Sequence, residues 1–148
     1  MDLSQVFVKG KVRKKMSGRF SDLGGRPRLL LAYADAAYAS ECGRYFRRLG
    51  WEVEMVASGV EARSIVSEYC PHVVVLDAQL LDESGWLTSA KISSANRDLR
   101  IILVSEDGAG PIQERVQMVG AEQAVCRHDG AEALANAILG NPSFSEAI

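Results

Sequence analysis

The sequence predicts a doubly wound α/β domain, in which a five-stranded parallel sheet carries helices on both faces. Short apolar runs alternate along the chain with segments whose apolar residues recur at helical spacing. Two of the runs, residues 73–76 and 101–104, are apolar at every position, which is typical of parallel strands that are covered on both faces. Five such strand–helix units follow one another with short connections.

The first two units lie between Pro27 and Pro71. Residues 29–33 form an apolar run, and the helix that follows is marked by Ala39, Cys42, Phe46 and Leu49. Gly50 ends this pattern, and Glu52–Val56 is the second expected strand. Ser58 and Glu61 have the spacing of a capping box, which predicts the start of the second helix there. That helix carries Ala62, Ile65, Val66 and Tyr69 on its inner face.

The remaining three units complete the sheet. Residues 73–76 form the third strand, and a helix is expected over residues 84–95. Residues 101–104 form the fourth strand, followed by a helix with Ile112, Val116 and Val119 on one side. Residues 124–126 form the fifth strand, and the stretch 129–132 is expected to cap a last helix that carries Leu134, Ala135, Ile138 and Leu139.

Composition indicates a single compact domain in the cytoplasm. The chain has 148 residues, of which 47% are hydrophobic and 24% are charged. No apolar run approaches the roughly 20 residues of a membrane-spanning helix, and the first residues lack the layout of a signal peptide. Cys42, Cys70 and Cys126 are scattered in apolar surroundings, which favours buried free thiols over a disulfide or a metal site.

Charge divides the chain near Pro27. Residues 1–28 contain eight Lys or Arg and two Asp, a net charge of +6, so the rest of the chain carries −8. We therefore expect a basic, flexible extension over residues 1–27, a folded domain over 28–140 and a short tail over 141–148. Residues 9–28 could dock on nucleic acid or an anionic surface, although a solvated tail is favoured. Residues 6–12 alternate and could instead form a hairpin or an added edge strand.

Asp77 stands where the third expected strand ends. In open parallel sheets, ligands and chemistry gather at the carboxyl ends of the strands, so a functional carboxylate is favoured over one that only caps the following turn.

The sequence around Asp77 resembles the receiver domain of bacterial response regulators, and the resemblance extends over about residues 28–139. Asp77 matches the phospho-accepting aspartate, Ser105 the hydroxyl residue after the fourth strand, and Arg127 the position of the family's lysine. Further matches are Leu80, Gly85, Trp86, Gly120 and Ala121. The resemblance implies a flavodoxin-like fold with strand order 2-1-3-4-5.

The metal site that the resemblance implies is incomplete. Receiver phosphorylation uses Mg²⁺, which prefers oxygen ligands, and the family places two acids after the first strand. The matching residues here are Tyr33 and Ala34, neither of which offers a carboxylate. A small shift in register would bring in Asp35, with a carbonyl near Gln79 as a second ligand.

Three substitutions concern the switch. Arg127 keeps the positive charge but has a planar group that suits a two-point grip on unmodified Asp77. His128 replaces a proline that the family holds in a cis bond, and a non-proline cis bond costs about 2.5–4 kcal/mol, so the last loop should take another path. Ala124 stands where the family has its switch aromatic residue.

Together these residues indicate a degenerate receiver, or pseudo-receiver, that is not an enzyme, needs no cofactor and acts by associating with a signalling partner. The resemblance implies contact, including homodimerisation, through the fourth helix, fifth strand and fifth helix. The alternative is a phospho-accepting receiver in which Asp77 is phosphorylated and Asp35 helps to bind Mg²⁺.

Enzymes fit less well. A phosphatase with an aspartate nucleophile would need a second acid in 77–79, and a nucleotide site would need a glycine-rich loop after the first strand. Ser105 lacks a nucleophile-elbow motif. His128 could sense pH at the crevice, although a histidine without a role is favoured.

Overall fold

The computed structural model describes residues 25–106 and 113–140. Most of the expected basic extension, the expected tail and Ile112 lie outside the described residues. The strands are β1 (Arg28–Ala32), β2 (Glu52–Val56), β3 (Val73–Asp77), β4 (Arg100–Ser105) and β5 (Gln123–Cys126). The helices are α1 (Ala36–Arg48), α2 (Gly59–Tyr69), α3 (Gly85–Ala95), α4 (Gln113–Met118), η4 (Arg127–Asp129, a 3-10 helix) and α5 (Gly130–Leu139).

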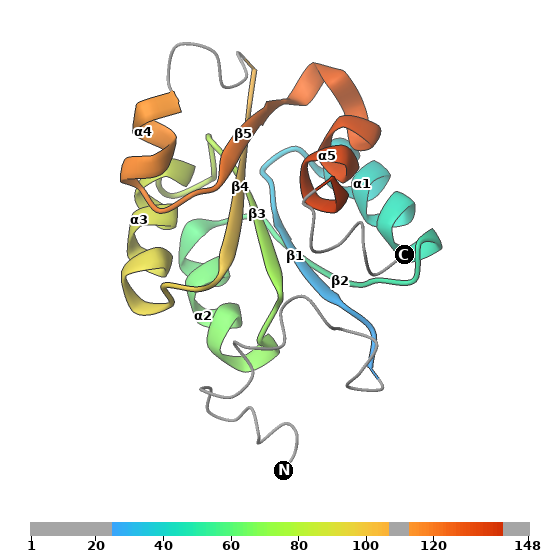
Figure 1. Ribbon diagram of the computed structural model, residues 1–148, viewed down its shortest axis with the longest axis horizontal. Coiled ribbons are helices and arrows are strands. Elements are labelled where there is room, and N and C mark those ends of the chain that lie inside the picture. The colour runs from blue at the N-terminus through green and yellow to red at the C-terminus, as the bar shows by residue number, and fades with distance from the viewer. Residues whose placement is uncertain (1–24, 107–112, 141–148) are drawn as a thin grey trace.

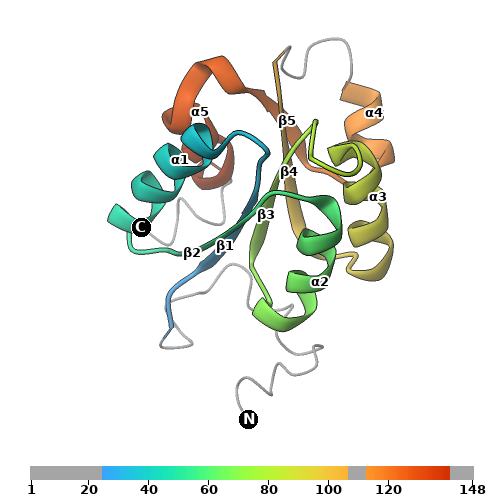
Figure 2. The ribbon, with the colours of Figure 1, turned by 180° about the vertical axis from the view of Figure 1, so that it is seen from behind.

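The five strands form one parallel sheet in the order β2-β1-β3-β4-β5, which confirms the predicted fold and strand order. Helices α1 and α5 cover one face, and α2, α3 and α4 cover the other (Figures 1 and 2). This three-layer arrangement buries β3 in the centre, between β1 and β4. No helix of residues 25–106 and 113–140 is long and apolar enough to cross a membrane.

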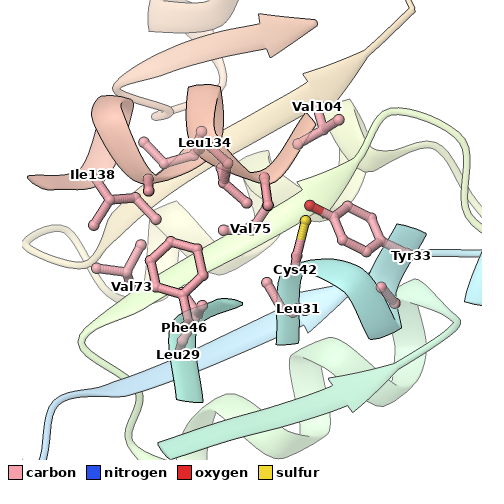
Figure 3. Packing of buried hydrophobic residues seen from close by; sticks show 14 of the residues in the cluster. Leu29, Leu31, Tyr33, Cys42, Phe46, Val73, Val75, Val104, Leu134 and Ile138 are labelled. Carbon is pink, nitrogen blue, oxygen red and sulfur yellow. The ribbon is translucent and has the colours of Figure 1, made fainter. Parts of the chain in front are cut away.

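Each face of the sheet has its own hydrophobic core. Odd-numbered residues of β1 and β3 pack under α1 and α5, around Phe46 and Leu134 (Figure 3). Even-numbered residues of the same strands pack under α2, α3 and α4, around Ala62 and Val116. Because side chains alternate along a strand, a strand that is apolar at every position fills both cores at once.

Polar caps fix where the helices begin. Ser58 Oγ accepts a hydrogen bond from Glu61 N at 3.1 Å, as the capping box predicts. The second bond of the box differs, because Glu61 Oε1 accepts from Ala57 N and not from the amide of the cap residue Ser58. Ser84 Oγ accepts from Leu87 N at the start of α3. At α5 the expected cap is wrong in detail, because Asp129 occupies the cap position without a capping hydrogen bond from its side chain.

The three cysteines form no disulfide with one another, but only Cys42 is buried, so the expectation of three buried thiols is wrong for Cys70 and Cys126. Cys70 caps α2 in the left-handed conformation, at a φ of 51°, and Cys126 ends β5. Both positions lie at the ends of elements, where the side chain reaches the surface.

Candidate functional site

The site is built around Asp77, the last residue of the central strand. Asp77 pairs with Val104 of β4, and the next amide, Ala78 N, donates to Val104 O at 2.8 Å. The residue is only 4% exposed, although its carboxylate stands at the carboxyl end of the sheet. Burial raises the pKa of Asp77, while the Gln79 amide, which donates to Oδ1 at 3.0 Å, and the Arg127 guanidinium lower it.

The loop after Asp77 is held in place by hydrogen bonds to α2. Asp82 accepts from Gly59 N at 2.7 Å and from Val60 N at 3.0 Å, at the positive end of the α2 helix. These contacts hold the pKa of Asp82 below its usual value. The loop between β3 and α3 is thus tied to the amino end of α2.

Gly85 closes that loop against the backbone of Asp77. Gly85 N donates to Ala78 O at 2.8 Å, and a Cβ added at Gly85 would lie 2.1 Å from Asp77 O. Only a residue without a side chain lets α3 start this close to the end of β3.

Arg127 connects three carboxylates at the carboxyl end of the sheet. Its Nη2 donates to Glu106 Oε2 at 3.0 Å, and its Nη1 lies 3.7 Å from Asp35 Oδ2 and 4.0 Å from Asp77 Oδ2. The expected two-point grip on Asp77 is not observed. Instead, the guanidinium is shared among residues at the carboxyl ends of β1, β3 and β4, and its only hydrogen bond to a carboxylate among the described residues goes to Glu106.

Glu106 was not among the predicted site residues. The signal that could have found it is its position directly after Ser105, at the carboxyl end of β4, where parallel strands bring their last residues together. Its side chain is exposed, so it reaches Arg127 from the solvent side.

Asp35 lies near Arg127, and both of its carboxylate oxygens already have partners. Its Oδ1 accepts hydrogen bonds from Ala37 N at 3.0 Å and Tyr38 N at 3.3 Å, which makes it the N-cap of α1. Its Oδ2 faces Arg127. One carboxylate therefore serves both the helix end and the guanidinium.

Tyr33 and Ala34, the positions expected to hold acids, contribute no charge. The Tyr33 side chain turns into the core beneath α1, where it packs against Tyr38 with ring centroids 4.7 Å apart and points toward Cys42 (Figure 3). Burial raises the pKa of Tyr33 far above its usual value. Ala34 is exposed. Within residues 25–106 and 113–140, no group of three His, Cys, Asp or Glu side chains could hold a metal ion.

The other predicted residues lie at the same end of the sheet. Gln79 pairs with Ser84 across the loop and leaves its side chain exposed. Ser105 ends β4 opposite Cys126, and Ala124 is buried in β5. His128 lies exposed in η4, directly after Arg127, so the last loop forms a 3-10 turn here.

Comparisons with known proteins agree with this architecture. Residues 30–139 match the family model of the response regulator receiver domain. The photosynthetic apparatus regulatory protein RegA of Rhodobacter capsulatus is 24% identical over 120 residues, which are 81% of this chain and 65% of that protein. The chain thus spans about two thirds of that relative's length.

Two solved structures show the same fold. A CheY-like response regulator receiver domain protein from Methanospirillum hungatei superposes with a TM-score of 0.73 at 18% identity, covering 82% of this chain and 99% of that one. The chemotaxis protein CheY4 of Vibrio cholerae superposes with a TM-score of 0.72 at 15% identity, covering 78% and 98%.

Proposed function

This chain belongs to the response regulator receiver domain family, and we propose that it is a pseudo-receiver, which signals by protein–protein association without Mg²⁺-dependent phosphorylation. Receiver domains act in two-component signalling through contacts with partner proteins. The proposal concerns what sets the conformation of this particular receiver domain.

The position of Arg127 carries the proposal. Phosphoryl transfer to an aspartate requires a metal ion that neutralises charge between the acceptor and neighbouring acids. Here the Arg127 guanidinium lies within 4.0 Å of both Asp77 and Asp35. A divalent ion that bound Asp77 and Asp35 would therefore have to compete with the guanidinium for both carboxylates.

The residues around Asp77 support the same conclusion. Tyr33 is buried under α1, Ala34 has no ligating group, and Asp35, whose Oδ1 caps α1, has only Oδ2 left for a metal ion. Metal binding would also require displacing Arg127 from its carboxylates.

The alternative, a phospho-accepting receiver, has one observation in its favour. Asp35 Oδ2 faces the same guanidinium as Asp77, and the Gln79 amide donates to Asp77, so a carboxylate and the Gln79 backbone lie near the acceptor. In that case Asp35 and the Gln79 carbonyl would hold Mg²⁺ after Arg127 has swung away.

Phosphorylation in vitro separates the two. The purified full chain is incubated with a small phosphoryl donor and Mg²⁺, and intact mass is followed beside Asp77→Asn and beside a competent receiver. The proposal expects no added phosphate on this chain. A phosphate that appears on the wild type and is absent from Asp77→Asn would establish the alternative.

The partner and its docking face belong to the proposal as well. The surface formed by α4, β5 and α5 is the expected contact, and Met118 of α4 is 81% exposed there. A homodimer through this surface would appear as a dimer mass in light scattering, and Met118→Glu should abolish it. A cytoplasmic location, and docking of residues 9–28 on an anionic surface, stay predictions.

A further inference from the structure

Strand β2 is an edge of the sheet whose outer side has no partner strand among the described residues. Its inner side pairs with β1, and Glu52 N donates to Pro27 O at 2.9 Å. Backbone groups alternate in direction along a strand, so those of Val53 and Met55 face outward. The Arg47 guanidinium donates to Val53 O at 3.2 Å, which shows that this carbonyl points to the outer side and that an added strand would replace this contact.

The two faces of this edge differ in charge. Glu52 and Glu54 are exposed on the face that α2 covers, next to Tyr69, whose pKa is raised to about 12 mainly by burial and then by Glu52. The Tyr69 hydroxyl is buried and has no hydrogen-bond partner among the described residues. On the α1 face, Val53 is half-buried and Met55 is 38% exposed. The edge is therefore acidic on one face and apolar on the other.

A segment of this chain has the complementary pattern. In residues 6–13, with the sequence VFVKGKVR, three cations stand at alternate positions: Lys9, Lys11 and Arg13. The intervening positions hold Val8, Gly10 and Val12. In an extended strand, alternate residues point to opposite faces, so the cations would share one face and the valines the other.

We propose that residues 6–13 add to the outer side of β2 as an antiparallel strand, with Lys9, Lys11 and Arg13 beside Glu52 and Glu54. Val8 and Val12 then lie on the face of Val53 and Met55. Opposite charges on neighbouring strands contribute roughly 0.2–1 kcal/mol per pair, and each outward amide of β2 gains an acceptor.

The antiparallel direction gives the shortest connection to the place where the chain enters the sheet. Pro27 lies beside Glu52, at the amino end of β2, so residues 14–27 need only pass from that end to the adjacent strand edge. Neighbouring strands are about 4.8 Å apart, well within reach of such a connection. An antiparallel edge strand on an otherwise parallel sheet is common in doubly wound folds, and it protects an open edge from pairing with other chains.

Amide hydrogen exchange of Val53 and Met55, measured by NMR on the full chain, tests the proposal. We expect both amides to be protected in the wild type and to exchange about tenfold faster or more in the variant Lys9→Glu/Lys11→Glu/Arg13→Glu. The variant Lys14→Glu/Lys15→Glu/Arg19→Glu has the same change in net charge outside the alternating segment, and it should keep the protection. The amides of Leu30 and Val74, in the core strands, serve as internal references.

A charge swap between the two segments tests their pairing more directly. Adding Glu52→Lys/Glu54→Lys to the first variant should restore the protection of Val53 and Met55. Absence of protection in the wild type, or equal loss in both triple variants, would overturn the proposal. Protection that rises with protein concentration, together with a dimer mass, would assign the strand to a second copy and overturn docking within one chain.

Discussion

The Arg127 guanidinium lies 4.0 Å from the Asp77 carboxylate, so a buried acid at the end of the central strand faces a cation that the protein itself supplies. The same guanidinium holds Glu106 and approaches Asp35. Arg127 thereby links residues at the carboxyl ends of β1, β3 and β4, and the following predictions rest on these contacts.

Arg127→Ala should raise the pKa of Asp77 further. Burial already favours the neutral acid, and the substitution removes a charge that favours the ionised form. The measurement is a pH titration of the Asp77 carboxyl carbon by NMR. Arg97→Ala is the matched control, because Arg97 is exposed in the connection before β4, at the other end of the sheet. An Asp77 titration that is the same in wild type and Arg127→Ala would contradict the assigned contact.

Asp77→Asn should increase the free energy of unfolding near neutral pH. The folded-state pKa of Asp77 lies above its usual value of 3.8, so the ionised acid costs stability in the native state, and the cost disappears as pH falls through the raised pKa toward 3.8. Asparagine keeps an acceptor for the Gln79 amide. Urea unfolding at several pH values measures the difference, with the exposed Asp129→Asn as control. A stability gain that does not shrink in acid would speak against a titrating Asp77.

His72 should make the native state sensitive to acid. Arg28 N donates to His72 Nδ1 at 3.0 Å, and burial, then the Arg28 charge, lower the pKa of His72 from 6.5 to about 3. Between about pH 3 and pH 6.5, His72 binds a proton in the unfolded chain but not in the folded chain. Stability should therefore fall as pH drops below 6.5, by up to about 1.4 kcal/mol per pH unit.

The variant His72→Asn isolates this effect, because an asparagine oxygen can replace Nδ1 as acceptor without titrating. The free energy of unfolding, measured between about pH 7 and pH 5, should fall less steeply in His72→Asn than in the wild type. His128→Gln, at an exposed histidine, is the control and should keep the wild-type slope. Equal slopes in wild type and His72→Asn would refute the assignment.

Gly85→Ala should destabilise the protein by about 1–3 kcal/mol, the usual range for overpacking. The added Cβ would lie 2.1 Å from Asp77 O, so α3 must move away from the end of β3. Gly43→Ala is the matched control, since its Cβ would come no closer than 3.4 Å to the Met55 sulfur. Gly43→Ala should leave stability unchanged or raise it, because alanine favours a helix more than glycine does and Gly43 lies within α1. Equal stability of the two variants would show that α3 can shift without cost.

The fold was predictable because hydrophobic pattern and helix caps act locally. The strand Glu52–Val56 was predicted with its observed bounds, Ser58 caps α2 where its spacing to Glu61 indicated, and Ser84 caps α3 at the start of the expected helix range 84–95. Strand ends were less certain, since β1 begins at Arg28 and stops at Ala32, one residue before the expected end. Whether a polar residue next to a strand joins the ladder depends on its neighbours in the sheet.

The site was predictable only in part. Sequence position was enough to place Asp77, Ser105 and Arg127 at one end of the sheet, because parallel strands end together. It could not show that Arg127 would bond to Glu106 in preference to Asp77, since this depends on the path of η4 and on the reach of an exposed side chain. The failed cap at Asp129 has the same origin, because η4 precedes α5 directly.

Titration of the full chain with Mg²⁺, followed by calorimetry, tests most directly whether Arg127 takes the place of a metal ion. The account predicts no saturable binding by the wild type at millimolar Mg²⁺, and binding by a variant that supplies an acid and shortens the cation, Ala34→Asp/Arg127→Lys. Saturable binding by the wild type that Asp77→Asn removes would contradict it.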